Sequence, residues 1–314
     1  MKNITILSLL AITLSASSLI HAAESVDRNL TLGTATKIDI KVQQGNVSIV
    51  TWDKSEVNVS GMLDELSEGL IFEVQSNDLV IEDKLPQRYS SQNNQGSTLT
   101  ISIPEHIDLI ANSISANYQL ANLKGQVQIN SVSGDLTLDK LEGKQVYKTV
   151  SGDIHSQQLV GDIRLTTVSG KIIDSDSQGS IHYTLVSGDL NGTSQAQEVN
   201  IETVSGDSHV KLLQATQVEL KSISGDSEML LAAKFNSINA ESVSGDIVLT
   251  FADMPSARVD IDGGPGGKIR NNLTPDAPQK AQHAPNSTLV FQAGAAEGTI
   301  KLSTISGSLT LDKD

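Results

Sequence analysis

The chain has 314 residues, no cysteine, only nine aromatic residues (one Trp, four Tyr, four Phe) and a formal charge of −15. The lack of cysteine excludes disulfide bonds, thiolate metal sites and a lipid-modified cysteine. The acidic balance disfavours nucleic acid, anionic lipid and polyanionic substrates as partners.

The first 23 residues differ in kind from the rest. Lys2 precedes an apolar run at residues 4–14, and small residues lead to a cleavage point after Ala22 or Ala23. This pattern is typical of a secretory signal peptide. No later segment reaches the ~20 continuous apolar residues of a membrane helix, so we expect an exported protein without a membrane span, in the periplasm or outside the cell. Removal of the signal peptide leaves 21 basic and 37 acidic residues, a formal charge of −16.

Residues 24–110 are predicted to form an N-terminal β region that caps a repetitive domain. Alternating apolar and polar residues indicate short strands at 37–42, 46–50, 56–60 and 99–103. The polar segment 86–97 predicts a flexible loop between two of these strands.

Residues 111–250 repeat a five-residue motif whose commonest form is TVSGD or SVSGD. Its glycines are 18, 19 or 20 residues apart, and a last copy lies near the C-terminus; they are Gly134, Gly152, Gly170, Gly188, Gly206, Gly225, Gly245 and Gly307. Aliphatic residues recur five and seven positions before the glycine and two positions after it. A unit this short cannot bury an apolar face alone, so successive copies must stack on one another. The repeat therefore predicts an all-β, single-stranded parallel β-solenoid with 18–20-residue rungs and a structural turn at each glycine.

A further aliphatic column stands two positions before the glycine: Ile114, Val132, Val150, Val168, Val186, Val204, Ile223, Val243 and Ile305. Its parity is opposite to that of the columns five and seven positions before the glycine, because side chains alternate along a strand. We expect a bend or bulge between them that turns this column into the core as well. Three tyrosines are also assigned to the core: Tyr118, Tyr147 and Tyr183.

Two other repeat architectures do not fit. Helical repeats need longer units and a 3.6-residue periodicity, whereas these units are rich in Val, Ile, Ser and Thr. A left-handed hexapeptide β-helix would want an aliphatic residue at every sixth place, where this chain has Lys144, Ser156 and Asp162.

Residues 251–314 are predicted to form irregular C-terminal rungs, a loop and a cap. Residues 257–269 resemble a further rung with a glycine-rich corner, and the proline-punctuated segment 271–287 predicts a protruding loop. The strands expected within 287–311 should cover the open end of the solenoid.

The aspartate that follows the motif glycine is the sharpest candidate for a site: Asp135, Asp153, Asp189, Asp207, Asp226 and Asp246. Stacked rungs would place these carboxylates ~4.8 Å apart, and calcium could relieve their mutual repulsion. The simpler interpretation is that each aspartate accepts hydrogen bonds from nearby backbone amides and faces water. Lys171 occupies the same column, where it can neutralise its neighbours.

Catalysis is not expected from the repeats. The serine before each glycine has no paired histidine, and a nucleophilic serine needs an adjacent base. His155 and His209 share a column but are three rungs apart, about 14 Å at the strand spacing, too far to share a zinc ion. Trp52 is the one aromatic residue expected at an exposed turn.

The motif ladder, the segment QGNVSIVTWDKSEVNVSG (44–61) and the segment GTIKLSTISGSLTL (298–311) resemble a bacterial family of exported proteins of unknown function that carry the label of adhesins. The resemblance covers essentially the whole mature chain. It implies a β-solenoid envelope protein and supplies no catalytic residues.

We therefore predict a non-enzymatic, adhesin-like protein that binds an envelope or extracellular protein or a glycan through its surface, with the loops 86–97 and 271–287 as a candidate patch. Two alternatives stay open. A polysaccharide-active β-helix enzyme would need non-repeated acids and bases that converge in a groove. A structural envelope protein would use calcium at the aspartate column for stability.

Overall fold

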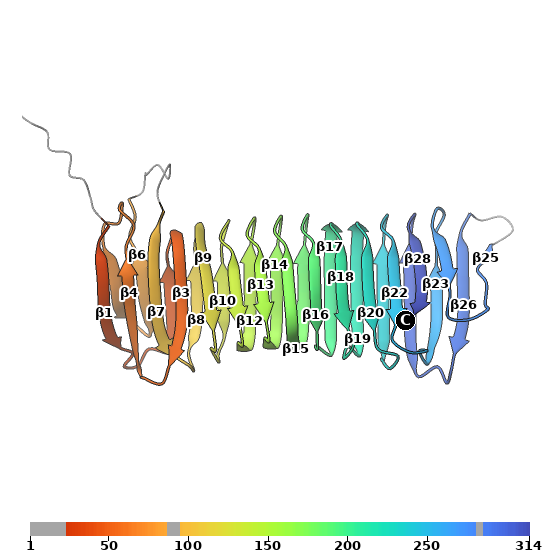
Figure 1. Cartoon of the computed structure of the whole chain (residues 1–314), viewed down its shortest axis with the longest axis horizontal. Coiled ribbons are helices and arrows are strands. Elements are labelled where there is room, and N and C mark those ends of the chain that lie inside the picture. The colour runs from red at the N-terminus through yellow and green to blue at the C-terminus, as the bar shows by residue number, and fades with distance from the viewer. Residues whose placement is uncertain (1–22, 87–94, 281–284) are drawn as a thin grey trace, which may run out of the picture.

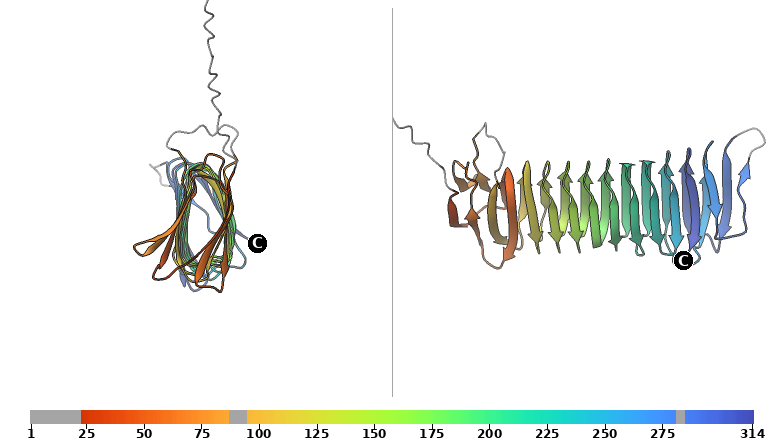
Figure 2. Two further views of the ribbon diagram at one scale, coloured as in Figure 1. Left: turned by 90° about the vertical axis from the view of Figure 1, so that its left-hand side faces the viewer. Right: turned by 45° about the horizontal axis from the view of Figure 1, so that its top comes forward.

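The computed structural model describes residues 23–86, 95–280 and 285–314, which form a long rod of stacked β-strands (Figure 1). These residues contain no helix, and hence none that could cross a membrane. Viewed along the rod, the strands form a narrow closed coil with two long sides (Figure 2). The predicted signal peptide lies, except for Ala23, outside the described residues.

One long side of the coil, sheet A, is mostly parallel. In spatial order it contains β1 (Ser25–Thr31), β4 (Glu56–Met62), β7 (Ser97–Pro104), β3 (Gln44–Trp52), β9 (Ser115–Ala121), β11 (Leu136–Asp139), β13 (Ile154–Gln157), the first part of β15 (Ile172–Leu185), β16 (Leu190–Ser194), β18 (Ser208–Leu212), β20 (Ser227–Leu231), β22 (Ile247–Phe251), β28 (Ser308–Lys313) and β24 (Lys268–Asn271).

The other long side, sheet B, faces sheet A across the core. In spatial order it contains β5 (Leu70–Gln75), β6 (Asp78–Asp83), β2 (Lys37–Lys41), β8 (Asp108–Asn112), β10 (Val127–Asn130), β12 (Glu142–Thr149), β14 (Val160–Thr167), the second part of β15, β17 (Glu198–Ser205), β19 (Gln217–Ser224), β21 (Ser237–Ser242), β27 (Gly298–Thr304), β23 (Ala257–Asp262), β26 (Ser287–Ala293) and β25 (Gln279–Lys280).

The core is filled by the columns of apolar residues that recur along the rod. Tyr147 pairs with Leu165 and Leu165 with Tyr183 on successive strands of sheet B, and all three side chains are buried. The three tyrosines predicted to be core residues are indeed buried. Because every buried column continues from rung to rung, the rod has one uninterrupted core and solenoid character.

The motif glycines lie where the chain passes from sheet B to sheet A. Each stacks directly on the backbone of the preceding corner: a Cβ atom on Gly152 would stand 2.1 Å from the carbonyl oxygen of Gly134. A second glycine column, which sequence analysis did not single out, lies at the return corner and comprises Gly125, Gly143, Gly161 and Gly179, all with positive φ. Close backbone stacking at both corners therefore requires glycine.

The C-terminal rungs do not follow the order of the chain. β27 and β28 pair with β21 and β22, while β23 and β24 stack outside them. The prediction that all strands of 287–311 cover the open end is thus wrong for β27 and β28. Gly307 explains the difference, because its motif repeats the corner and stacks on Gly245, where a Cβ would stand 2.0 Å from the carbonyl oxygen. The antiparallel strand β26 does cover β23.

The two predicted loops are only partly irregular. Ser97, at the end of the segment 86–97, is buried and begins β7, while residues 87–94 lie outside the described residues. Within 271–287, Leu273 is buried and β25 pairs with β26, while residues 281–284 lie outside the described residues. Both segments are therefore anchored by the solenoid at their described ends.

Two adjacent rungs contain buried hydroxyl groups without a hydrogen-bond partner among the described residues: Thr203, Ser208, Ser222 and Ser227. The register places Thr203 beside Ser222 and Ser208 beside Ser227. In the neighbouring rungs Leu190 and Ile247 occupy the position of these two serines. Ser208 and Ser227 thus place two uncompensated hydroxyl groups in an otherwise apolar column of sheet A.

We expect the double variant Ser208→Ile/Ser227→Ile to be more stable than the natural chain. An unsatisfied buried hydroxyl costs about 1–3 kcal/mol, and the larger side chains extend the apolar column. The denaturation midpoint in urea should therefore rise. Ser156→Ile is the matched control, because Ser156 donates a hydrogen bond to Asp174 and its loss should lower the midpoint. A lower midpoint for the double variant would contradict the expectation.

Candidate functional site

The aliphatic column two positions before each motif glycine lies on the surface, and the prediction that it enters the core is wrong. Its nine side chains are between 37% and 53% exposed; they are Ile114, Val132, Val150, Val168, Val186, Val204, Ile223, Val243 and Ile305. We call this column the aliphatic ridge.

Plain strand alternation explains why the ridge faces outward. The residue before the ridge, such as Thr149 or Thr167, is the last inward side chain of sheet B. Alternation places the next residue outside, and the chain bends only after it, so that the glycine, not the Val or Ile, returns to the interior. The bend therefore follows the ridge residue, whereas the sequence analysis expected it before that residue.

The ridge is continuous along the rod. In seven rungs, the amide of the serine that follows the ridge residue donates to the carbonyl oxygen of the preceding ridge residue, as from Ser133 to Ile114 (2.8 Å) and from Ser187 to Val168 (2.7 Å). Nine corners at the strand spacing of ~4.8 Å give a length of about 38 Å. Sequence-distant Ile305 joins this row, because the Ser306 amide donates to Val243 (3.1 Å).

A hydroxyl group fixes the backbone next to the ridge in five rungs. The amide of the motif glycine donates to the side-chain oxygen three residues earlier, over 2.9–3.0 Å, at Ser131, Thr149, Thr167, Ser242 and Thr304. Sequence analysis gave these residues no role, although the Ser/Thr turn pattern could have identified them. The bond closes the corner and holds the ridge residue in a defined position.

The motif aspartates form a row beside the ridge. Their Oδ1 atom accepts a hydrogen bond from the amide of the next rung, as in Asp153 to Asp135 (2.9 Å), Asp226 to Asp207 (2.9 Å) and Ser308 to Asp246 (2.7 Å). This contact is the one described by the simpler of the two interpretations. The aspartates thereby continue the backbone ladder around the corner, while their side chains stay exposed or half-buried.

The structure does not gather the aspartates around a common point. Within the described part of the chain, no three His, Asp or Glu side chains form a group that could hold a metal ion. Lys171 lies in the row with its Nζ 3.7 Å from Asp189 Oδ2. Calcium binding by the six aspartates remains a prediction, which melting with and without a chelator would test.

The histidines and the tryptophan that the sequence analysis discussed lie away from the ridge. His155 and His209 do share a column of sheet A, separated by Ile173 and Asn191. Trp52 is half-buried and its Nε1 donates to the Glu56 carbonyl oxygen (2.8 Å), while the Lys54 ammonium lies 4.4 Å from the ring centroid. The structure thus brings none of these residues to the ridge.

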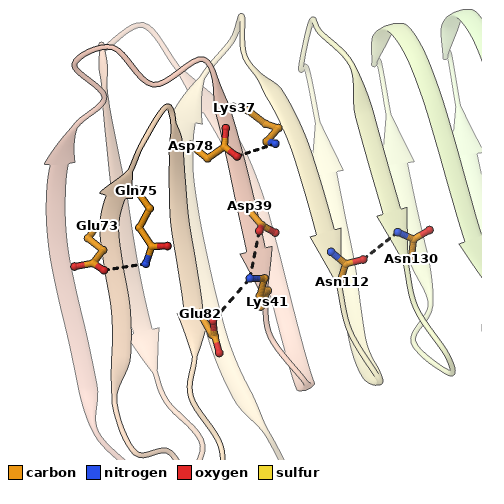
Figure 3. A network of polar contacts seen from close by, with 9 residues as sticks. All are labelled: Lys37, Asp39, Lys41, Glu73, Gln75, Asp78, Glu82, Asn112 and Asn130. Atoms are coloured by element: carbon orange, nitrogen blue, oxygen red, sulfur yellow. Dashed lines mark hydrogen bonds and ion pairs between the residues drawn. The ribbon is translucent and has the colours of Figure 1, made fainter.

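The outer face of sheet B is polar, in contrast to the apolar ridge. At the N-terminal end, Lys37 pairs with Asp78 (2.8 Å) and Lys41 with Asp39 (3.4 Å), and the amides of Asn112 and Asn130 form a short ladder (Figure 3). The hydrogen bond that the Lys37 ammonium donates to the Asp78 carboxylate raises the pKa of Lys37. Exposed pairs of this kind contribute little to stability, so we assign them to solubility.

The carboxyl group of Asp174 is enclosed in the core. Asp174 is 1% exposed, and its Oδ1 accepts hydrogen bonds from Ser156 and Ser177 (both 2.6 Å) and its Oδ2 from Tyr183 (2.8 Å). Burial raises the pKa of the Asp174 carboxyl despite these three donors. Because the group is closed to solvent, it belongs to the packing of the rod and not to a substrate site.

Comparison with protein-family models gives a match over most of the chain. The family model Toastrack DUF4097 matches residues 35–312. A search of curated proteins found no match.

The solved structures that match this chain are distant from it in sequence. A "putative adhesin" from Parabacteroides distasonis is 13% identical over 94% of this chain and 98% of its own (TM-score 0.41), and one from Parabacteroides merdae is 12% identical over 92% and 96% (TM-score 0.40). A "putative lipid binding protein" from Parabacteroides distasonis is 13% identical over 91% and 96% (TM-score 0.35).

Proposed function

For this chain, which belongs to the Toastrack DUF4097 family, we propose the function of an exported, non-enzymatic binding protein. It is a rigid solenoid rod, with rungs of 18–20 residues, that holds a partner protein along the aliphatic ridge. The observation that carries the proposal is the ridge itself, nine large aliphatic side chains exposed in one unbroken row. Contiguous apolar surface of this kind marks interaction sites on soluble proteins.

The energetics of the ridge favour an extended partner. Full burial of a Val or Ile side chain stabilises by about 1.5–3 kcal/mol, so covering one that is some 40% exposed would contribute roughly 0.6–1.2 kcal/mol. Association itself costs several kcal/mol. A partner must therefore cover many ridge residues at once, which requires a long contact parallel to the rod.

The aspartate row defines the charge of that partner. It lies one residue beyond the motif glycine along most of the ridge, and Lys171 is the single cation in it. Charge complementarity favours a protein surface with apolar side chains beside Lys or Arg. A second copy of this acidic chain would bring a like charge to the contact. A glycan would find no hydrogen-bonding side chain on the ridge itself.

The test is a triple variant of the ridge, Val150→Ser/Val186→Ser/Val204→Ser. The mature chain is used to capture its partner from an envelope extract, and the dissociation constant of the purified partner is then measured by calorimetry. We expect the variant to bind about 10- to 100-fold more weakly, since three apolar contacts are lost. Added salt should weaken binding to the natural chain as well, because it screens the aspartate row.

A matched control distinguishes loss of the ridge from a general effect of replacing exposed apolar residues by serine. Val160, Ile173 and Val290 are 40%, 38% and 58% exposed, compared with 43%, 38% and 41% for the three ridge residues, and lie off the ridge. The triple variant Val160→Ser/Ile173→Ser/Val290→Ser should bind as the natural chain does. Failure to capture any partner, or equal loss in both triple variants, would overturn the proposal.

A further inference from the structure

The outer face of sheet B carries a polar furrow. No ridge residue lines it. A hollow of about 320 Å³ runs across β14, β15, β17, β19 and β21, between two rows of outward side chains. The rows include Arg164, His182, Glu198, Asn200, Gln217 and Glu219. Successive rungs supply the same positions, since Glu198 pairs with Gln217 and Asn200 with Glu219.

The furrow continues toward the N-terminus. A second hollow of about 250 Å³ lies between the same two rows, with Lys144 beside Asp162 and Val146 beside Arg164 in the register. Two hollows on one line make a site that is long and narrow. A linear ligand parallel to the rod axis fits this shape better than a compact one.

The backbone of the furrow floor is not available to a ligand. β17 pairs with β15 on one side and with β19 on the other, so its amides and carbonyls are used in the sheet. An extended peptide therefore cannot bind here by strand addition, which needs a free sheet edge. Recognition must come from the side chains of the two rows.

The charges of the furrow exclude strongly charged ligands. Asp162 already pairs with Arg164 (3.2 Å) and Glu219 with Lys221 (2.6 Å). The carboxylates would repel a polyanion, and Arg164, Lys37 and Lys144 in the same lining would repel a polycation. The ligand favoured by this balance is neutral.

The remaining lining groups both donate and accept hydrogen bonds. Asn200, Gln217 and Asn239 present carboxamides and Ser180 and Ser237 present hydroxyls. The Asn200 carboxamide is weakly held, with Nδ2 3.5 Å from Glu219 Oε2 and Oδ1 without a partner among the described residues. It can therefore turn toward a ligand. Such groups recur every ~4.8 Å along the rod.

The geometry points to a second binding site, in which the sheet B furrow binds a neutral linear oligosaccharide parallel to the rod axis. Sugar hydroxyls donate and accept, as the lining carboxamides and serines do, and a polymer meets the same groups on successive rungs. The site is independent of the ridge, so the rod would hold a protein along one corner and a glycan along one face.

The test uses an array of neutral, anionic and cationic oligosaccharides probed with the mature chain. We expect neutral linear oligosaccharides to be retained. The variant Asn200→Val/Gln217→Leu should bind the retained oligosaccharide at least tenfold more weakly, because sugar hydroxyls lose their partners. Asn191→Val is the matched control on the outer face of sheet A, and the triple ridge variant should keep full glycan affinity.

The outcomes separate this site from the function proposed for the ridge. Retention of no glycan, retention of charged glycans alone, or equal binding by the furrow variant would overturn the furrow site and leave the ridge untouched. Cleavage of the retained oligosaccharide would uphold the furrow as the glycan site and overturn the non-enzymatic function. Circular dichroism and melting of each variant establish that the rod is intact.

Discussion

Replacing Gly188 by alanine is expected to lower the stability of the rod by about 3 kcal/mol or more. A Cβ atom there would stand 1.7 Å from the carbonyl oxygen of Gly170, a backbone atom that cannot move without disturbing the rungs on both sides. The clash, not the backbone angle, is the cause, because Gly188 does not adopt a positive φ. Calorimetry should show a lower melting temperature.

Gly192→Ala is the matched control for this prediction. Gly192 lies only four residues further along the chain, also without a positive φ, but its nearest Cβ contact would be 3.2 Å, to the Asp174 carbonyl oxygen. We expect a change within about 1 kcal/mol, of either sign. If both alanine variants melt together, close stacking of the corner glycines does not determine the stability of the rod.

The enclosed carboxyl of Asp174 is expected to make the rod less stable as pH rises. Its pKa is raised in the folded chain, so between the usual value of about 3.9 and the folded value the folded state binds more protons than the unfolded state. Stability therefore falls as pH increases through this window and stays lower above it. Each unit by which the pKa is raised costs about 1.4 kcal/mol at neutral pH.

The variant Asp174→Asn separates this contribution from those of the other carboxyl groups of the chain. Its amide keeps an acceptor oxygen for the surrounding hydroxyls but cannot ionise, so the loss of stability between pH 4 and pH 7 should be smaller than in the natural chain. Urea denaturation at several pH values measures the difference. Identical pH profiles for the two chains would show that Asp174 does not retain its proton, and a steeper profile for the variant would contradict the sign.

The fold could be predicted from the sequence because its signal is periodic. A motif that recurs every 18 to 20 residues, together with aliphatic columns of the same period, indicates a coil of stacked short strands. The second glycine column has the same period, as at Gly143 and Gly161, but no recurring flanking sequence identifies it. The order of the last rungs could also have been inferred, since the corner at Gly307 repeats the one at Gly245.

The ridge could not be predicted from composition and period alone. Exposed Val186 and buried Ile201 are both large aliphatic residues that recur with the same spacing, so hydrophobicity does not separate them. They differ only in whether their position along the strand points inward or outward. The sequence analysis assumed a bend that would turn both inward. The burial of Asp174 and Gln145 could not be predicted either, because each has one hydrogen-bond partner, Ser156 or the Val160 carbonyl, in a neighbouring rung.

The insertion of β27 and β28 beneath β23 has a consequence for how the rod is completed. The strands that come last in the chain are the direct neighbours of β21 and β22, while the earlier β23 and β26 lie further out. During synthesis, β23 and β26 emerge before β27, the strand that joins them to β21. The outermost strands therefore cannot stack on the rod until the final strands are present. A chain that stops short of them leaves the edges of β21 and β22 open to pairing with another chain.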